Sequence, residues 1–421
     1  MRRIAVRWST GKQKLVIMFA VNVVCFFLAH FTLSSLHLIG HRRTFPLRSQ
    51  RSAPSGSTPD PKKTPEDMQL TTSEVSKHVN TTKARLFKNS ACVSNQFFND
   101  TTRCSSCLRP GAGKIEFLRT PVEHLNPANY TGYFKPASGV VQNLITDYLI
   151  TPSLDCPYLL AVQASVKDRP HERDLVRRTW GSVAETQTWP NRTINAKIKI
   201  LFVVAHINKT EQENQRNHTL QFAELVSEAR LHNDILYIDM IDNYQNLTLK
   251  LVSAFKWVKD NCPCVTFVLK VDFDTFVNVP LLVDFLLLHQ DEFVFSVLGV
   301  VYKNAVRRWG RWRVPKSVYP MQNYPFYASG CAYVLSMKVI SQVVDTAPHY
   351  RILPIEDAFI TGILRLVIGY QLVNVPTAFT HYTDNKWHHC QLLNDTKALA
   401  VSRQGYKHKR VWKSFLESSC R

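Results

Sequence analysis

The stretch Thr266-Phe267-Val268-Leu269-Lys270-Val271-Asp272-Phe273-Asp274 places two carboxylates directly after an apolar run. The run is short and rich in β-branched residues, so we predict a buried strand over Thr266–Val271. In open α/β sheets, ligands bind beyond the carboxyl ends of the strands. Asp272 and Asp274 are therefore candidate ligands for Mg²⁺ or Mn²⁺ bound to a nucleotide diphosphate, whose departure the metal would assist. A helix cap or a solvated turn is the alternative for the same D-x-D pattern.

Around this strand, the chain after Cys156 alternates apolar runs with longer amphipathic stretches. This pattern is typical of an α/β domain, and because the runs lack strict polar alternation we expect a central, mostly parallel sheet. The other predicted strands are Tyr158–Val166, Ile198–Val204, Ile235–Asp239 and Phe295–Val301. The predicted helices lie around Arg173–Thr179, Thr219–Arg230 and Leu247–Lys259.

Near the start of the chain, residues 15–38 form an apolar run long enough to cross a bilayer, which takes about 20 residues. The run exceeds the apolar core of a usual signal peptide and no A-x-A cleavage site follows it, so we predict one uncleaved transmembrane helix that anchors the chain. Residues 1–14 are then a cytosolic tail. Residues 39–85, poor in large apolar residues, form a disordered stem. We assign residues 86–155 to a cysteine-containing lead-in segment and residues 156–421 to a lumenal domain.

The orientation of this anchor rests on glycosylation sequons, because basic residues flank the apolar run on both sides. All eight N-x-S/T sequons follow the anchor, which favours a lumenal body and type II topology. The predicted glycosylation sites are Asn80, Asn99, Asn129, Asn191, Asn208, Asn217, Asn246 and Asn394.

Nine of the ten cysteines also lie beyond the anchor. A lumenal body permits disulfides, and because nine is odd at least one thiol is free or bonds another chain. The pairs Cys104/Cys107 and Cys262/Cys264 raise zinc binding as an alternative. No second pair with His at finger spacing accompanies them, so we expect structural disulfides.

The chain of 421 residues is 45% hydrophobic, which predicts a sizeable core, and its formal net charge is +20. Such a charge is compatible with nucleic acid, a membrane surface or an anionic small substrate. The basic residues are spread in ones and twos without interleaved aromatic residues, so we expect no nucleic-acid partner.

Five ordered blocks after Cys156 resemble the β-1,3-glycosyltransferase family, whose members transfer galactose, N-acetylglucosamine or N-acetylgalactosamine. The matching family patterns are R-x-x-I-R-x-T-W-G, D-I-L-x-x-D-F-x-D-x-Y-x-N-L-T-x-K, K-x-D-D-D-V-F-V-N, Y-P-x-Y-x-x-G-x-G-Y-V-x-S and E-D-V-x-x-G. In this chain the blocks run over Arg173–Gly181, Asp234–Lys250, Lys270–Asn278, Tyr324–Ser336 and Glu356–Gly362.

The resemblance implies a GT-A type nucleotide-sugar-binding domain, a UDP-sugar donor, Mn²⁺ or Mg²⁺ as cofactor, and inversion of the donor linkage to a β1→3 bond. Inversion by one displacement needs a base for the acceptor hydroxyl, and Asp357 matches the family's candidate, with Glu356 as the fallback. Both residues are also compatible with a helix N-terminus, where acidic side chains are favoured. Lys270 joins Asp272 and Asp274 as an implied donor-binding residue.

Weaker candidates surround these carboxylates. Arg173 and Arg177 are four residues apart and share a helix face, so they are candidate contacts for the diphosphate, with an exposed arginine pair as the alternative. The candidate substrate-pocket residues, for which plain packing is the equal alternative, are Tyr324, Tyr327, Gly330 and Trp312.

Three positions depart from the family pattern. Phe273 replaces a middle acidic residue. Ala332 replaces a glycine, and its methyl group fills space near the pocket. Ser402 stands about ten residues before Trp412, where the family usually has a His, and this weakens the site if that His is a metal ligand. The candidate replacements are His381, His388, His389 and His408.

We therefore expect an inverting hexosyltransferase of the Golgi membrane that moves galactose or an N-acetylhexosamine from its UDP-sugar to a glycan on protein or lipid. The alternative is a lumenal non-catalytic relative that binds glycan or assists a partner glycosyltransferase. Phe273 and Ser402 favour this alternative, whereas the retained carboxylates argue against it. The oligomeric state is left open, a homo-oligomer included.

Overall fold

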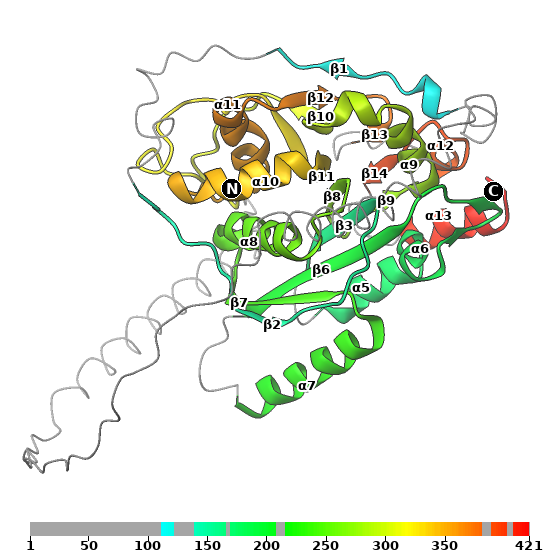
Figure 1. Cartoon of the computed structure of the whole chain (residues 1–421), viewed down its shortest axis with the longest axis horizontal. Helices are drawn as coiled ribbons and strands as arrows, with labels where there is room; N and C mark the ends of the chain where they lie inside the picture. Colours follow the sequence, from blue (N-terminus) through cyan, green and yellow to red (C-terminus); the bar gives the residue numbers. More distant parts are fainter. Residues whose placement is uncertain are drawn as a thin grey trace, which may run out of the picture. The chain divides into compact units, whose positions relative to one another are not determined.

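A computed structural model describes residues 111–121, 139–165, 169–207, 215–380, 389–401 and 407–420. Its centre is a nine-stranded sheet in the order β1-β12-β10-β11-β8-β3-β6-β7-β2 (Figure 1). The strands are β1 (Leu118–Arg119), β2 (Tyr148–Ile150), β3 (Leu159–Ala164), β6 (Ile198–Ile207), β7 (Ile235–Asp242), β8 (Phe267–Val271), β10 (Ser296–Tyr302), β11 (Tyr327–Ser336) and β12 (Gln371–Asn374).

The five predicted strands are all present, as β3, β6, β7, β8 and β10. The prediction of a mostly parallel sheet was wrong, because four of the eight neighbouring pairs are antiparallel. The main cause is β11, which runs antiparallel to both β8 and β10. This strand is buried along nearly its whole length, and a strand covered on both faces has an apolar sequence whatever its direction.

Helices cover both faces of the sheet and create two apolar cores (Figure 1). Successive residues of β3 point alternately into these cores, Leu159 into one and Leu160 into the other. The Leu160 face is covered by α8 (Leu247–Asn261), α10 (Met337–Thr346) and α11 (Leu364–Ile368). The Leu159 face is covered by α5 (Pro170–Arg177), α6 (Val183–Thr186), α7 (Gln215–His232), α9 (Val279–Leu288), α12 (His389–Leu393) and α13 (Lys407–Leu416). The predicted helices correspond to α5, α7 and α8.

Both outer edges of the sheet come from the predicted lead-in segment. Strand β1 pairs with β12 at one edge, and β2 pairs with β7 at the other. The described part of this segment therefore belongs to the same sheet as the residues that follow Cys156.

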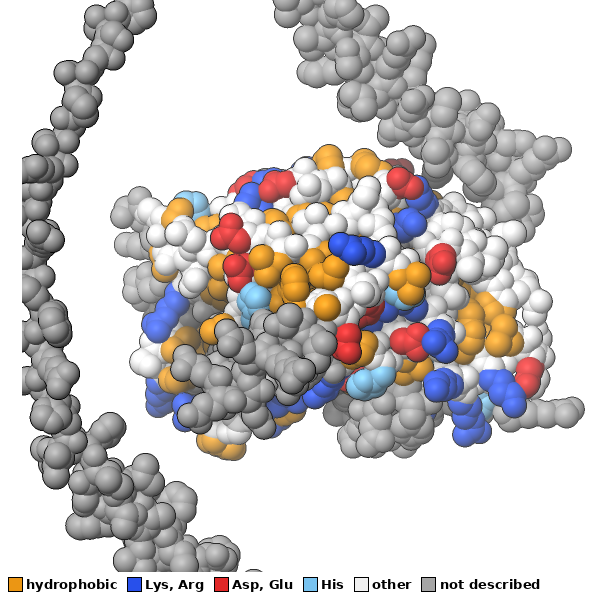
Figure 2. Space-filling view, turned by 90° about the horizontal axis from the view of Figure 1, so that it is seen from below, with side chains coloured by type: hydrophobic (Ala, Val, Ile, Leu, Met, Phe, Trp, Pro, Cys, Tyr) orange, Lys and Arg blue, Asp and Glu red, His pale blue; other side chains and the backbone are white. Residues whose placement is uncertain are grey.

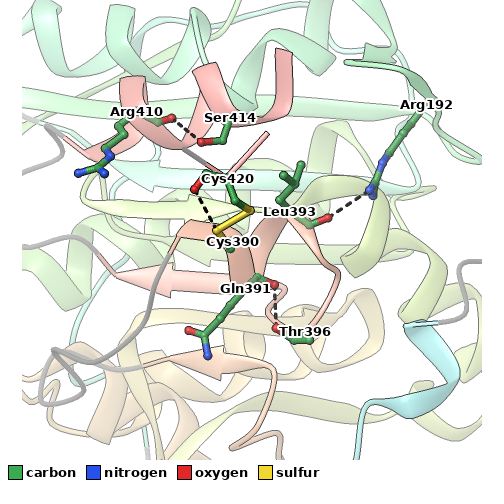
Figure 3. Close-up of a disulfide and its surroundings, with 8 residues drawn as sticks. All are labelled: Arg192, Cys390, Gln391, Leu393, Thr396, Arg410, Ser414 and Cys420. Carbon is green, nitrogen blue, oxygen red and sulfur yellow. Dashed lines mark hydrogen bonds between the residues drawn. A yellow bond between two sulfur atoms is a disulfide. The ribbon is translucent and has the colours of Figure 1, made fainter. Parts of the chain in front are cut away.

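Within the described residues, two disulfides connect distant parts of the chain, as expected from the cysteine usage. Cys156 bonds Cys264, and Cys390 bonds Cys420, which ties α12 to the residues after α13 (Figure 3). Cys262 is a buried free thiol beside the first disulfide, which removes zinc binding by Cys262 and Cys264. Cys92, Cys104 and Cys107 lie outside the described residues.

The predicted anchor and stem also lie outside the described residues, and within the described ranges no helix is long and apolar enough to cross a membrane. Of the sequon asparagines, Asn191 and Asn394 are exposed and Asn246 is half-buried, while Asn217 lies in α7. The other predicted glycosylation sites lie outside the described residues: Asn80, Asn99, Asn129 and Asn208.

On the face seen in Figure 2, lysine and arginine side chains are dispersed among acidic and apolar ones.

Candidate active site

The candidate site forms where β8 ends beside β11. Val271 is the last residue of β8 and pairs with Ala332 of β11. The next residue, Asp272, donates its backbone N–H to the Cys331 carbonyl at 2.9 Å. The Asp272 side chain is 39% exposed, whereas Asp274 is only 4% exposed. The two carboxylates thus occupy the strand end where the sequence placed them, one at the surface and one beneath it.

Lys270 is the centre of a buried ion cluster. Its Nζ atom lies 2.8 Å from Asp272 Oδ1 and 2.7 Å from Glu356 Oε1, and it donates to the Gly330 carbonyl. Burial alone would lower the pKa of Lys270, but Asp272 and Glu356 hold it well above its usual value. An ammonium has three protons, and three acceptors use them here. In this structure Lys270 therefore holds the carboxylates together, and its predicted contact with the donor stays a prediction.

Asp357 is held by two backbone groups. The Gly330 N–H donates to its Oδ2 and the Ala358 N–H to its Oδ1, both at 2.8 Å. Asp357 also caps η8 (Ala358–Ile363), a π-helical turn that continues into α11, so the expectation of a helix N-terminus is confirmed. Burial, followed by the nearby Glu356 charge, raises the pKa of Asp357 to about 7. A carboxylate with this pKa can accept a proton near neutral pH.

Glu356 is less suited to proton transfer than its neighbour. It is buried, and its two oxygens are engaged by Lys270 and by the Tyr333 hydroxyl, which donates at 2.7 Å. Burial raises the pKa of Glu356, while Lys270 and Tyr333 oppose that rise. The geometry therefore favours Asp357 over the fallback residue as the base.

Arg173 and Arg177 are engaged by carboxylates. Arg173 donates through Nε and Nη2 to Glu228 at 2.7 and 2.6 Å. Arg177 donates to Asp234 through Nε and Nη2 and to Glu228 through Nη1, at 2.7 to 2.8 Å. Arg173 is 1% exposed, so the alternative of an exposed pair was wrong. The arginines connect α5 to α7 and to Asp234, the residue before β7, and their contact with a diphosphate stays a prediction.

The predicted pocket residues separate into buried and exposed groups. Tyr324 and Tyr327 are buried, with ring centroids 5.9 Å apart, and Asn304 donates to the Tyr327 hydroxyl at 2.9 Å. Gly330 lies against Asp357, as described above. Trp312 is 46% exposed, and the guanidinium of Arg307 lies 5.1 Å from its ring. Packing thus accounts for Tyr324, whereas Trp312 is accessible to a ligand.

Two residues near the site were missed by the sequence analysis. Burial raises the pKa of Tyr244 to about 12, and the nearby charges of Asp357 and Glu356 add to this effect. Lys250 is buried and donates to Asp242 at 2.8 Å and to the Ser165 carbonyl, beyond the end of β3, at 2.9 Å. Both residues belong to the matching block Asp234–Lys250, and this was the sequence signal that could have identified them. Lys250 lies on the buried face of α8.

The donor set at β8 fits Mg²⁺ or Mn²⁺ as a partial protein shell. Within the described ranges, no group of three or more His, Cys, Asp and Glu could hold a metal. Mg²⁺ usually takes one or two protein carboxylates, and water and substrate phosphates complete its shell. Asp272 and Asp274 can supply that share without a further protein ligand. Phe273, between them, is half-buried.

Of the candidate replacement histidines, His389 and His408 lie within the described residues, and His408 contacts the backbone of Asp274. It is fully buried, with its ring centroid 5.6 Å from that of Phe276. Burial lowers the pKa of His408 to about 4, although the backbone of Asp274 acts in the opposite direction. His408 is therefore neutral at pH 7 and packs beside the candidate metal ligands. His389 is also buried, whereas Ser402, His381 and His388 lie outside the described residues.

A methyl group at Gly330 should disturb the base. A Cβ atom there would lie 2.9 Å from Asp357 Oδ2 and 3.1 Å from Glu356 Oε1. We expect Gly330→Ala to lower the catalytic efficiency by about tenfold, because a hydrogen bond to a charged group is strained or lost. Steady-state kinetics test this, with Gly139→Ala as the matched control, since a Cβ at Gly139 meets nothing within 4 Å. Equal efficiencies of the two variants would contradict it.

Comparisons with known proteins identify the family to which the sequence belongs. The sequence model of the Galactosyltransferase family matches residues 171–376. A β-1,3-galactosyltransferase 5 from Gorilla gorilla gorilla is 32% identical, over 54% of this chain and 72% of the relative. A β-1,3-N-acetylglucosaminyltransferase 7 from Rattus norvegicus is 34% identical, over 50% of this chain and 51% of the relative. A solved galactosyltransferase with donor and acceptor sugar analogues has 13% identity, covers 62% of this chain and 96% of its own, and gives a TM-score of 0.33, too low to define the fold.

Asp272 and Asp274 lie at a strand end, and Asp357 is the candidate base beside them. Together with these relatives, they define a UDP-sugar glycosyltransferase. The chain belongs to the galactosyltransferase family. The predicted enzyme class, a β-1,3-glycosyltransferase, is thereby confirmed.

Proposed function

We propose that the chain transfers galactose or an N-acetylhexosamine from a UDP-sugar to a glycan hydroxyl, with inversion to a β1→3 bond. The observation that carries this proposal is Asp357, a carboxylate with a raised pKa that two backbone N–H groups hold beside the end of β8. The two kinds of transferase among the relatives support galactose and N-acetylglucosamine as the donors to test first. The GT-A type of fold is part of the same proposal.

The proposed reaction is one in-line displacement. Asp357 takes the proton from the acceptor hydroxyl as that oxygen bonds the anomeric carbon, and the bond from this carbon to UDP breaks with its electrons on the diphosphate. Lys270 fixes the spacing of the carboxylates through Asp272, Glu356 and the Gly330 carbonyl. Mn²⁺ or Mg²⁺, when held by Asp272 and Asp274, would neutralise charge on the departing diphosphate.

We also propose that the protein is a type II membrane protein of the Golgi apparatus, anchored by residues 15–38 and active in glycoprotein or glycolipid glycosylation. The eight sequons beyond the apolar run support a lumenal body. The disulfides Cys156–Cys264 and Cys390–Cys420 support an oxidising compartment. Protease protection of the full-length chain in sealed microsomes tests this topology, and digestion of the body without detergent would contradict it.

A donor screen tests the proposed activity. The full-length chain is incubated with UDP-galactose and with UDP-N-acetylhexosamines, with and without Mn²⁺, and both donor hydrolysis and transfer to a broad acceptor panel are measured. We expect one donor to be preferred and Mn²⁺ to stimulate its use. Asp274→Ala should raise the Mn²⁺ concentration for half-activation by roughly tenfold, whereas Asp345→Ala, at an exposed position, should not. Undetectable transfer by the unmutated chain would contradict the proposed function.

The pH dependence of transfer provides a further prediction. Since the pKa of Asp357 is raised to about 7, the fraction of carboxylate able to accept a proton falls as the pH drops below that value. We expect kcat at saturating donor, acceptor and Mn²⁺ to decline on the acid side with an apparent pKa near 7. Parallel measurement of UDP binding separates this effect from loss of the donor. A rate that stays constant between pH 5 and 8 would contradict it.

A further inference from the structure

The connection from β10 to β11 contains a loop whose backbone is hydrogen-bonded to its own Arg308 side chain. Arg308 donates from Nη1 to the carbonyls of Val314 and Tyr319, both at 2.8 Å, and from Nη2 to that of Met321 at 2.5 Å. The side chains of Val314 and Tyr319 are fully buried. A bridge between Ala305 and Asn323 closes the base of the loop. The residues between these anchor points are therefore held in place before any ligand binds.

The outer part of this loop is basic and aromatic. Four of the seven residues from Arg307 to Arg313 are arginine and none is acidic. Arg307 and Arg311 are exposed, as is Trp309, whose exposed fraction is 78%. The Arg311 guanidinium lies 5.0 Å from the ring of Tyr244, much as Arg307 lies over Trp312.

The guanidinium groups of Arg307 and Arg311 are available to a ligand. Within the described ranges no carboxylate lies at ion-pair distance from either of them. Stacking over an aromatic ring uses the face of a guanidinium and leaves its in-plane N–H donors for an anion. By contrast, Arg308, Arg173 and Arg177 use their donors within the fold.

The loop borders the proposed base. The charges of Asp357 and Arg311 act in opposite directions on the pKa of Tyr244. Those of Asp357 and Arg307 do the same for the pKa of Tyr327. Asn304, three residues before Arg307, donates to the Tyr327 hydroxyl at 2.9 Å, and Tyr327 shares β11 with Gly330, whose N–H donates to Asp357 at 2.8 Å. The two arginines therefore belong to a loop whose base is hydrogen-bonded to the strand that contacts Asp357.

We propose that Arg307 and Arg311, with Trp309 beside them, form an acceptor subsite for an anionic glycan, one that carries a carboxylate or a sulfate near the hydroxyl that receives the sugar. The inference rests on the proposed function, because it identifies the acceptor class of the same site. A guanidinium matches the planar pair of oxygens of a carboxylate or sulfate and can donate two parallel hydrogen bonds. An indole adds an apolar surface for a sugar ring.

Matched acceptor pairs test the subsite. The full-length chain is assayed at saturating donor with one oligosaccharide in neutral and sulfated forms, and with a second in neutral and uronic acid forms. We expect a charged acceptor to be preferred in kcat/KM, and the pair with the larger preference identifies sulfate or carboxylate as the anion. Arg307→Gln and Arg311→Gln should each reduce this preference by about tenfold, and the donor KM, measured separately at saturating acceptor, should be unchanged. The matched control Arg230→Gln, at an exposed position of α7, should keep the preference.

The possible results separate the subsite from the proposed function. If both arginine variants raise the donor KM and treat charged and neutral acceptors alike, the arginines hold the diphosphate and the inference is overturned. Transfer by the unmutated chain without preference for charge would also overturn it, while the proposed function would stand. If the unmutated chain transfers no sugar, the proposed function fails. Calorimetric binding of the same glycans in the presence of UDP then decides the subsite, which requires tighter binding of the charged form.

Discussion

Asp357→Asn should lower kcat for sugar transfer by about 10² to 10⁴-fold, the usual contribution of a general base. An amide cannot take the acceptor proton at neutral pH. Asn also offers one oxygen where Asp357 accepts from two N–H groups, those of Gly330 and Ala358, so the thermal midpoint must be measured beside kcat. Asp345→Asn is the matched control, because Asp345 is exposed on α10.

Glu356→Gln completes this comparison. Because Glu356 is held by Lys270 and Tyr333, its substitution should weaken the ion cluster and lower stability, and the acid limb of the pH profile should remain. If Asp357→Asn retains kcat within a few-fold and Glu356→Gln loses transfer instead, the assignment of Asp357 as the base is contradicted. Glu356 is then favoured as the base.

Lys270→Met should lower the free energy of unfolding by about 3–5 kcal/mol and abolish most transfer. Removal of one partner from a buried ion cluster leaves the charges of the other residues uncompensated. Here the buried Glu356 and the partly exposed Asp272 both lose their ion pair with Lys270. Denaturant titration of the full-length chain, followed by fluorescence, measures the change. Lys259→Met is the control, since Lys259 pairs with an exposed Asp345 and such pairs contribute only about 0–1 kcal/mol.

A double variant tests whether the cluster is the cause. Lys270→Met combined with Glu356→Gln removes the buried charge that the single substitution leaves behind, so we expect part of the lost stability to return. If Lys270→Met costs no more than Lys259→Met, the ion cluster does not stabilise the site as described.

The strands were predictable from the sequence because local signals determine them. The apolar run that becomes β8 stops at Asp272, and the boundary matches within one residue of the predicted Thr266–Val271. Strand direction was not predictable in the same way. The residues of β11 have the composition of a fully buried strand, and only the connection from β10 makes it antiparallel to its neighbours.

The candidate site was partly predictable, because family-like motifs identify carboxylates but not their partners. The role of Lys270 depends on Gly330 and Glu356, which come from elements 60 or more residues further along the chain. The ion pairs of Arg173 likewise depend on Glu228, 55 residues away. Local spacing does not contain such contacts, since the first arise only when β8, β11 and η8 pack together, and the second only when α5 packs against α7.

The most direct test of the proposed reaction is the structure of the product made by the full-length chain. The preferred UDP-sugar donor and a neutral or anionic acceptor are incubated with Mn²⁺, and the new linkage is determined by NMR from the anomeric coupling constant and the substituted carbon. We expect a β1→3 bond, formed with inversion and lost in Asp357→Asn. An α-linked product, or β1→3 transfer at an undiminished rate by Asp357→Asn, would contradict it.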